Sequence, residues 1–106
     1  MRIDEKYLRV TMPDGSKWDV PIKVIAESRA RYYAKADGVS HEESYEKDTI
    51  SLFEEDAYNI EDWAANNMNW EDVKALAVRA SDAEDDVDFQ EGWINGEKEV
   101  VERPKK

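Results

Sequence analysis

Residues 6–20 read KYLRVTMPDGSKWDV, and this stretch decides the fold class. Apolar and polar residues alternate over 6–12, which is typical of a strand with one buried face. Pro13 presets φ and Gly15 accepts a positive φ, so the chain is expected to turn there. Residues 17–20 (KWDV) then return as a second strand. The sequence therefore predicts a β-hairpin near the N-terminus.

A helix is predicted directly after this hairpin, because the apolar period changes at Ile22. Pro21 suits the boundary, since it lacks the N–H that the interior of a strand or helix would need. The helix is expected to end at Gly38, a residue that readily adopts the left-handed conformation beyond a last turn. Its predicted core-facing residues are Ile22, Ile25, Ala26, Tyr32, Tyr33 and Ala36.

A second helix is predicted from Ser40, which stands three residues before Glu43 in the spacing of a capping box. The helix is expected to run to about Tyr58. Its predicted core-facing residues are Tyr45, Thr49, Leu52, Phe53 and Ala57. Two short helices are expected next, because the pattern Asn, apolar, Glu, Asp, apolar occurs at 59–63 and again at 69–73. Each asparagine can cap a helix.

The C-terminal third is predicted to hold a second hairpin. Residues 73–80 fit either a helix or a strand, and their alanine content favours the helix. Residues 81–86 (SDAEDD) are expected to form an acidic loop. Residues 87–94 and 97–102 flank Asn95-Gly96, the preferred two-residue turn of a type I′ hairpin.

These elements together predict an α+β fold. It has an N-terminal β-hairpin, a helical middle and a C-terminal β-hairpin, with a small antiparallel sheet covered by helices. A single compact domain is expected over residues 1–102, followed by a mobile tail at 103–106. Leu, Ile, Val and Phe are scarce, a composition typical of disorder, but eleven aromatic residues oppose it because each ring buries roughly 150–250 Å².

The charge is concentrated in the middle of the chain. Residues 36–73 hold twelve Asp/Glu and one base, Lys47, so their net charge equals the −11 of all 106 residues. Residues 1–35 carry a net +3 and residues 74–106 a net −3. A block of one sign attracts cationic partners and repels polyanions. The predicted partner is therefore a basic protein surface, and direct binding of nucleic acid or an anionic membrane is not expected.

No catalytic, metal or cofactor site is predicted, and the chain is expected not to be an enzyme. The single histidine, His41, lies beside Glu42 and Glu43, but catalysis would need a nucleophile or an orienting carboxylate brought to it, and neither a cysteine nor a Gly-x-Ser-x-Gly motif supplies that nucleophile. Residues 82–88 (DAEDDVD) fail the EF-hand pattern, because Val87 stands where a glycine is needed and Trp93 where a glutamate is needed. Adventitious binding of divalent cations by this segment stays open.

Other classes are excluded by composition. The chain has no cysteine, which removes disulfides and cysteine-ligated zinc. No apolar run approaches the ~18 residues of a membrane span, and no signal peptide is recognisable. A soluble, cytoplasmic protein is expected.

The predicted partner-binding face consists of carboxylates and two tryptophans in the acidic middle. Its members are Glu42, Glu43, Glu46, Glu54, Glu55, Asp56, Glu61, Asp62, Trp63, Trp70, Glu71 and Asp72. A tryptophan ringed by carboxylates can anchor a basic surface. Core packing is the alternative for Trp63 and Trp70, because such rings bury a large area.

The string DFQEGWINGEKEVV at 88–101, after WEDV at 70–73, resembles small uncharacterised acidic proteins of bacteriophages and prophages. The resemblance covers the last third of the chain. It implies an inhibitor of a host enzyme or defence complex, acting in the host cytoplasm, where some such proteins imitate the charge of nucleic acid. The alternative is a structural or assembly component whose acidity serves solubility.

Overall fold

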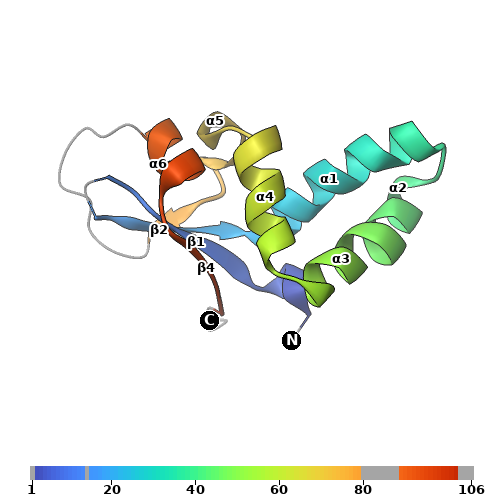
Figure 1. Cartoon of the computed structure of the whole chain (residues 1–106), viewed down its shortest axis with the longest axis horizontal. Coiled ribbons are helices and arrows are strands. Elements are labelled where there is room, and N and C mark those ends of the chain that lie inside the picture. Colours follow the sequence, from blue (N-terminus) through green and yellow to red (C-terminus); the bar gives the residue numbers. More distant parts are fainter. Residues whose placement is uncertain (1, 14, 80–88, 103–106) are drawn as a thin grey trace.

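The fold is described from a computed structural model over residues 2–13, 15–79 and 89–102. The elements in chain order are the 3-10 turn η1 (Ile3–Glu5), β1 (Tyr7–Thr11), β2 (Lys17–Pro21), α1 (Ile22–Asp37), α2 (His41–Glu43), the π-helical segment η2 (Ser44–Thr49), α3 (Ile50–Glu55), α4 (Tyr58–Asn67), α5 (Trp70–Val73), β3 (Val78–Arg79), α6 (Phe89–Asn95) and β4 (Lys98–Val101). The predicted α+β class is confirmed (Figure 1).

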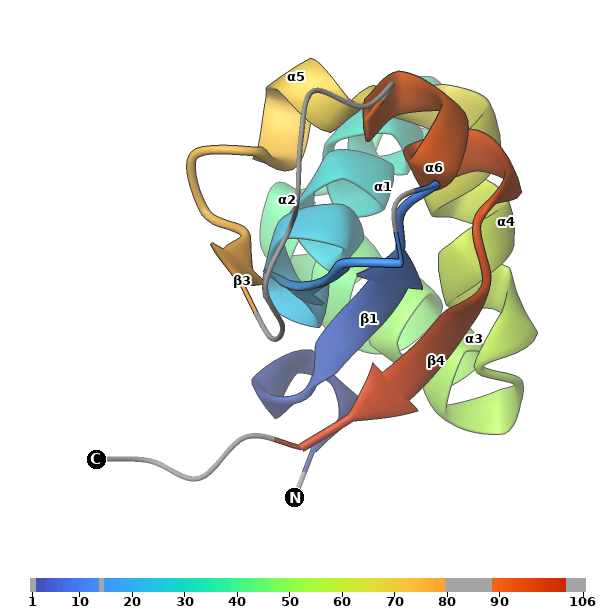
Figure 2. The ribbon, with the colours of Figure 1, turned by 90° about the vertical axis from the view of Figure 1, so that its left-hand side faces the viewer.

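The sheet has the order β3-β2-β1-β4, and each neighbouring pair is antiparallel. Leu8 of β1 lies opposite Val20 of β2 and Val100 of β4. Leu8 and Val20 are fully buried, because the helices cover this face of the sheet (Figure 2). The predicted N-terminal hairpin is confirmed, with Gly15 at φ 86° in its turn.

Helix α1 begins directly after Pro21 and ends at Gly38, as the sequence predicts. Gly38 adopts the left-handed conformation with φ 69°, and its N–H donates to the carbonyl of Ala34. The predicted inner face is wrong at two positions, since Tyr32 is 60% exposed and Ala36 is also exposed. The buried face follows the row of Ile22, Ala26 and Ala30, which successive turns of a helix bring into line.

Helix α1 also buries Arg29, a residue that the sequence pattern did not place in the core. Its guanidinium donates to Thr49 Oγ1 at 2.9 Å and pairs with Asp48 at 3.2 Å. The charge is therefore satisfied inside the fold, which is the condition for burying an arginine.

The segments α2, η2 and α3 follow one another without a break from His41 to Glu55. The predicted N-cap is confirmed, because Ser40 Oγ accepts the N–H of Glu43 at 3.0 Å. The end predicted at Tyr58 is wrong: the backbone becomes extended at Asp56, whose carboxylate accepts the N–H of Tyr58 and starts α4. Tyr45, Thr49 and Phe53 are buried as predicted, whereas Leu52 is half-buried and Ala57 exposed.

Only one of the two predicted asparagine caps is present. Asn69 starts α5 in a capping box with Asp72. Asn59 instead lies inside α4 and donates its amide to the carbonyl of Leu52. Asp56 takes the place at the start of α4 that the pattern gave to Asn59.

The predicted C-terminal hairpin is wrong. Residues 89–95 form helix α6, and β4 pairs with β1 rather than with the segment before it. Gly96 does not have the positive φ that a type I′ turn requires. The physical reason lies in Trp93, which is fully buried and donates its indole N–H to the carbonyls of Ala64 and Met68 at the end of α4.

Residues 74–79 do not form the helix that the alanine content of this segment favoured. Helix α5 ends at Val73, and β3 pairs with β2. The acidic loop predicted at 81–86 and the tail predicted at 103–106 lie outside the described residues.

Candidate functional site

The acidic residues of 36–73 lie on α1 to α5 and on the turns between them. We call these twelve carboxylates the acidic block: Asp37, Glu42, Glu43, Glu46, Asp48, Glu54, Glu55, Asp56, Glu61, Asp62, Glu71 and Asp72. All except the half-buried Glu61 are exposed residues. The block is therefore surface charge, as the sequence predicts.

Few of these carboxylates are neutralised within the chain. Four form ion pairs, namely Glu43 with Lys47 at 3.9 Å, Glu46 with Arg2 at 2.7 Å, Asp48 with Arg29 at 3.2 Å and Glu71 with Lys74 at 2.8 Å. The other eight make no ion pair over residues 2–13, 15–79 and 89–102. The helical layer consequently presents unpaired negative charge to solvent.

Some members of the block have structural roles. Glu54 accepts the backbone N–H of Ile3 at 2.9 Å, which ties η1 to α3. Asp56 and Asp72 accept backbone N–H groups at the starts of α4 and α5. Asp62 accepts the amide of Asn66. By contrast, Glu42 and Glu55 are exposed and, like Asp37, make no hydrogen bond or ion pair over the described residues.

The predicted face is divided in space. Glu71 and Asp72 lie on α5, which packs against α6, whereas most of the block lies on the helices from His41 to Asn67. Trp70 is 7% exposed, and its ring centroid is 5.7 Å from that of Trp18 and 6.2 Å from that of Trp93. Trp70 is therefore a core residue, which decides the alternative that the sequence left open.

Trp63 is half-buried and forms a cluster with two tyrosines of α1. Its ring centroid lies 5.7 Å from that of Tyr32 and 5.8 Å from that of Tyr33, and its indole N–H donates to Ser28 Oγ at 3.2 Å. We call Tyr32, Tyr33 and Trp63 the aromatic cluster. Tyr32, at 60% exposure, makes this cluster part of the surface.

Arg29 contacts the aromatic cluster through the ring of Tyr33. Its guanidinium carbon is 4.5 Å from the centroid of the Tyr33 ring, within the range of a cation–π contact. The same side chain binds Asp48 and Thr49 of η2. It therefore fixes the cluster relative to the continuous helical stretch from His41 to Glu55, which we call the acidic helix. The sequence missed Tyr32 as a surface residue. No local signal marked it, since the consecutive residues Ile25 and Ala26 of the same helix are both buried.

A second group of ionised side chains holds the N-terminus on the acidic helix. Arg2 binds Asp4 and Glu46 at 2.7 Å each, and these hydrogen bonds raise the pKa of Arg2. Burial acts to raise the pKa of Asp4, but the hydrogen bonds from Arg2 and Tyr45 outweigh it and lower that pKa. Burial, together with the bond to Asp4, raises the pKa of the Tyr45 phenol.

The other face of the sheet carries an ion pair between the half-buried Arg9 and a buried aspartate. Asp19 is fully buried and accepts two hydrogen bonds from Arg9, at 2.8 and 3.0 Å. These bonds raise the pKa of Arg9, with a smaller contribution from Glu99 across the strand pair. Burial lowers the pKa of Lys98, whose ammonium donates to carbonyls of Ile94 and Gly96 at the end of α6.

His41 lies at the surface of the fold. His41 is exposed at the start of α2, and its ring centroid is 6.1 Å from that of Tyr45. In the described part of the chain, no group of three His, Cys, Asp or Glu residues is arranged to hold a metal ion. The segment 82–88 lies outside that part.

Over the same ranges, no helix is both long and apolar enough to cross a membrane. No protein-family model, curated protein or solved structure matches the chain. Similarity therefore contributes nothing to its function, and the resemblance to phage proteins stays a prediction.

Proposed function

We propose that the chain is a non-enzymatic, acidic protein-binding module that docks on a basic protein surface. The observation that carries this proposal is the set of eight exposed or half-buried carboxylates of the acidic block that make no ion pair over the described residues. Clustered like charge opposes folding through self-repulsion. A basic partner removes that repulsion and gains charge-assisted contacts in return.

The aromatic cluster supplies the second component of such a surface. Binding energy at protein interfaces is concentrated in a few aromatic and arginine anchors, while surrounding charges steer the encounter. Tyr32 offers an exposed ring, and Tyr33 and Trp63 hold it in place. Asp62 stands next to Trp63 on α4, so the anchor is bordered by negative charge.

The narrower form of the proposal is an inhibitor of phage type. Its target would be a host protein whose basic surface otherwise binds nucleic acid, and its location would be the host cytoplasm. The support is the charge of the acidic block together with the resemblance of residues 70–73 and 88–101. An extended row of carboxylates can occupy a surface that binds phosphates.

The test uses two double variants with equal changes of charge. Glu42→Lys with Glu55→Lys removes two exposed block members that make no hydrogen bond or ion pair in the described part of the chain. The matched control, Glu97→Lys with Glu102→Lys, alters two exposed residues on either side of β4. Immobilised wild-type chain should retain a basic protein from host lysate at low salt and release it at high salt.

The affinity of that purified protein should then fall at least about tenfold for the block variant and less than about twofold for the control. Equal affinities for wild type and block variant would contradict the proposal. So would a partner whose binding is indifferent to salt, because a surface of opposite charges must respond to screening.

A further inference from the structure

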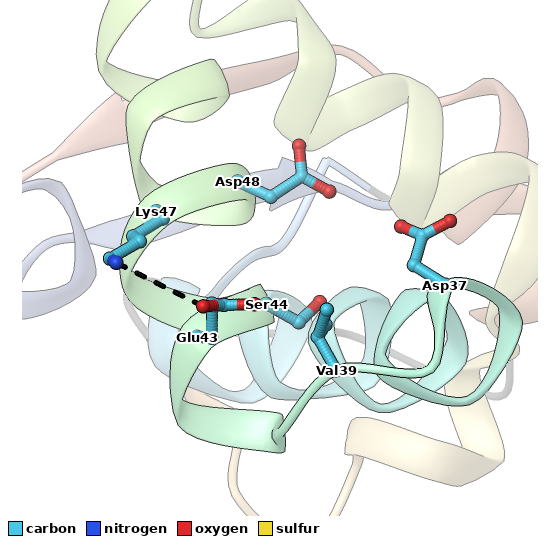
Figure 3. A pocket seen from close by; sticks show the side chains of 6 residues that line it. All are labelled: Asp37, Val39, Glu43, Ser44, Lys47 and Asp48. Carbon is cyan, nitrogen blue, oxygen red and sulfur yellow. Dashed lines mark ion pairs between the residues drawn. The ribbon is translucent and has the colours of Figure 1, made fainter.

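A pocket lies between the C-terminal end of α1 and the π-helical segment η2. Its volume is about 400 Å³, and it is lined by Asp37, Val39, Glu43, Ser44, Lys47 and Asp48. Figure 3 shows Asp37 and Asp48 approaching the same space from α1 and η2, with the hydroxyl of Ser44 turned toward it. None of these residues was assigned to a pocket from the sequence.

Ser44 is the unusual member of this lining. The residue is 2% exposed, and its hydroxyl has no hydrogen-bond partner in the described part of the chain. A buried hydroxyl without a partner is energetically unfavourable, and nearly all buried polar groups in folded proteins have a hydrogen-bond partner. Ser44 also opens the π-helical segment, a form of helix found frequently at functional sites. Its hydroxyl is thus a buried hydrogen-bonding group without a partner in the wall of the pocket, over the described residues.

The position of Asp37 is electrostatically unfavourable for a carboxylate. It is the last residue of the 16-residue helix α1, where the helix dipole favours cations and opposes a carboxylate. It is exposed and makes no ion pair or hydrogen bond over the described residues. No hydrogen bond or ion pair among residues 2–13, 15–79 and 89–102 compensates this charge.

The pocket as a whole is negative. Asp37, Glu43 and Asp48 face one base, Lys47, which sits 3.9 Å from Glu43. Asp48 shares its charge with Arg29 at 3.2 Å. The carboxylates do not converge as metal ligands do, within the part of the chain that the structure describes. A ligand for this site must therefore be a cation with several donors spread over its surface.

We propose that this pocket binds the guanidinium group of an arginine side chain presented by the partner protein. A guanidinium has five N–H donors in a planar fork and is weakly hydrated, which suits acceptors that are separated rather than convergent. Asp37 and Asp48 accept charge-assisted hydrogen bonds from it, and Ser44 supplies a neutral acceptor. The inference rests on the proposed function, since it names the group by which the basic partner is held.

The proposal predicts opposite effects of one substitution on stability and on binding. Asp37→Asn removes a carboxylate from the negative end of α1, so the melting temperature should stay the same or rise. The same change removes a charge from the pocket, so binding should weaken. A residue with a merely structural role would lose stability when it was changed.

The first experiment needs no partner. The full chain is titrated with N-acetyl-arginine amide, and the backbone amide shifts of residues 37–48 are followed by NMR. N-acetyl-citrulline amide, which has the same shape without the charge, is the matched ligand control. The arginine compound should cause saturable shifts in the wild-type chain. The affinity obtained from them should fall at least about fivefold in Asp37→Asn and in Ser44→Ala. Glu55→Gln, an exposed acid outside the pocket, should leave them unchanged.

An equal response to the citrulline compound, or wild-type affinity in Asp37→Asn, overturns the site. The second experiment uses the partner captured as described above. Asp37→Asn should speed its dissociation, whereas Glu42→Lys with Glu55→Lys should mainly slow its association. If the arginine compound binds but Asp37→Asn leaves the partner's dissociation unchanged, the pocket takes free guanidinium compounds and the assignment to a partner's arginine is wrong. If only the expected slowing of association by Glu42→Lys with Glu55→Lys is missing, the proposed function is contradicted. The pocket is then still supported by the first experiment.

Discussion

Asp4 shows how single side chains connect the N-terminus to the acidic helix. Its carboxylate accepts hydrogen bonds from Arg2 at 2.7 Å and from the phenol of Tyr45 at 2.8 Å. The lowered pKa of Asp4 means that the folded state favours the ionised carboxylate more than the unfolded chain does. Asp4 therefore contributes stability above the pKa of an unfolded aspartate, and that contribution is lost as the pH falls through the folded pKa.

Asp4→Asn should accordingly reduce the free energy of unfolding by about 1 kcal/mol at pH 7, a modest value because Arg2 is partly exposed to solvent. The difference between wild type and variant should shrink as the pH falls below 3.8, the ordinary pKa of an aspartate, because the unfolded wild-type chain then takes up a proton before the folded state does. Urea unfolding at pH 7 and at pH 3 measures both differences. A difference in the free energy of unfolding that is larger at pH 3 than at pH 7 would contradict the lowered pKa of Asp4.

Gly96 is required for a reason other than backbone conformation. A Cβ added there would clash with the carbonyl oxygens of Thr11 and Gly92, both of them backbone atoms. Gly96→Ala should therefore lower the free energy of unfolding by about 2–3 kcal/mol, since the backbone must move apart. Gly38→Ala is a useful comparison, because its site is open and the cost of about 1–2 kcal/mol comes only from the positive φ.

Urea unfolding of both glycine variants gives the comparison. A smaller loss at Gly96 than at Gly38 would mean that β1 and the end of α6 do not approach as described.

The tryptophans show what the sequence could and could not reveal at this scale. Trp63 and Trp70 lie at different positions in the two copies of one local pattern, at 59–63 and 69–73, with acids beside each. Their burial differs because of partners distant in sequence: Trp70 meets Trp18 and Trp93, whereas Trp63 meets Tyr32 and Tyr33 near the surface. Such neighbours are set by tertiary packing, which local pattern does not contain.

Helix α6 is held to α4 by one indole. Trp93 donates to the carbonyls of Ala64 at 2.9 Å and Met68 at 3.1 Å, and so satisfies acceptors near the last turn of α4. Trp93→Phe keeps most of the buried ring but removes this donor, and the free energy of unfolding should fall by about 1–3 kcal/mol.

The matched control is Trp63→Phe, which loses a bond to Ser28 at a half-buried site and should lose less than about 1 kcal/mol. Chemical denaturation of both variants measures the difference. Equal losses would show that Trp93 does not link the two helices.

The elements near the N-terminus followed from local sequence, and those near the C-terminus did not. Pro21 and Gly38 mark α1 because each has a strong conformational preference of its own. Asn95-Gly96 has an equally strong preference, but the same residues also suit the end of a helix. Phe89 and Trp93 stand four residues apart, a helical spacing that the alternating pattern concealed.

The π-helical segment η2 had no signal in the sequence. Residues 44–49 read SYEKDT, and nothing in that composition distinguishes a π-helix from an α-helix. The consequence for the site is direct, because the unpartnered hydroxyl of Ser44 and the pocket beside it depend on this segment. The acidic surface was predictable from the sequence, but the pocket within it was not.

At the scale of the whole molecule, the field of the acidic block is expected to repel phosphate. Neither duplex DNA nor RNA should be retarded by the chain in a gel at low salt, where screening is weakest and the Debye length is about 30 Å at 0.01 M. The Glu42→Lys, Glu55→Lys variant should behave in the same way, because a strongly negative net charge remains. Binding of either nucleic acid at micromolar concentration would contradict the interpretation of the charge.

The association rate of the chain with its captured partner, measured against ionic strength, tests the central claim most directly. Electrostatic steering by the acidic block predicts a rate constant that falls steeply from 0.01 M to physiological salt, as the Debye length shortens from about 30 to about 8 Å. Glu42→Lys with Glu55→Lys should flatten that dependence, and Glu97→Lys with Glu102→Lys should change it little. A block variant with the wild-type slope, or a control variant that alone flattens it, would contradict the account and move the binding surface to the β4 edge of the sheet.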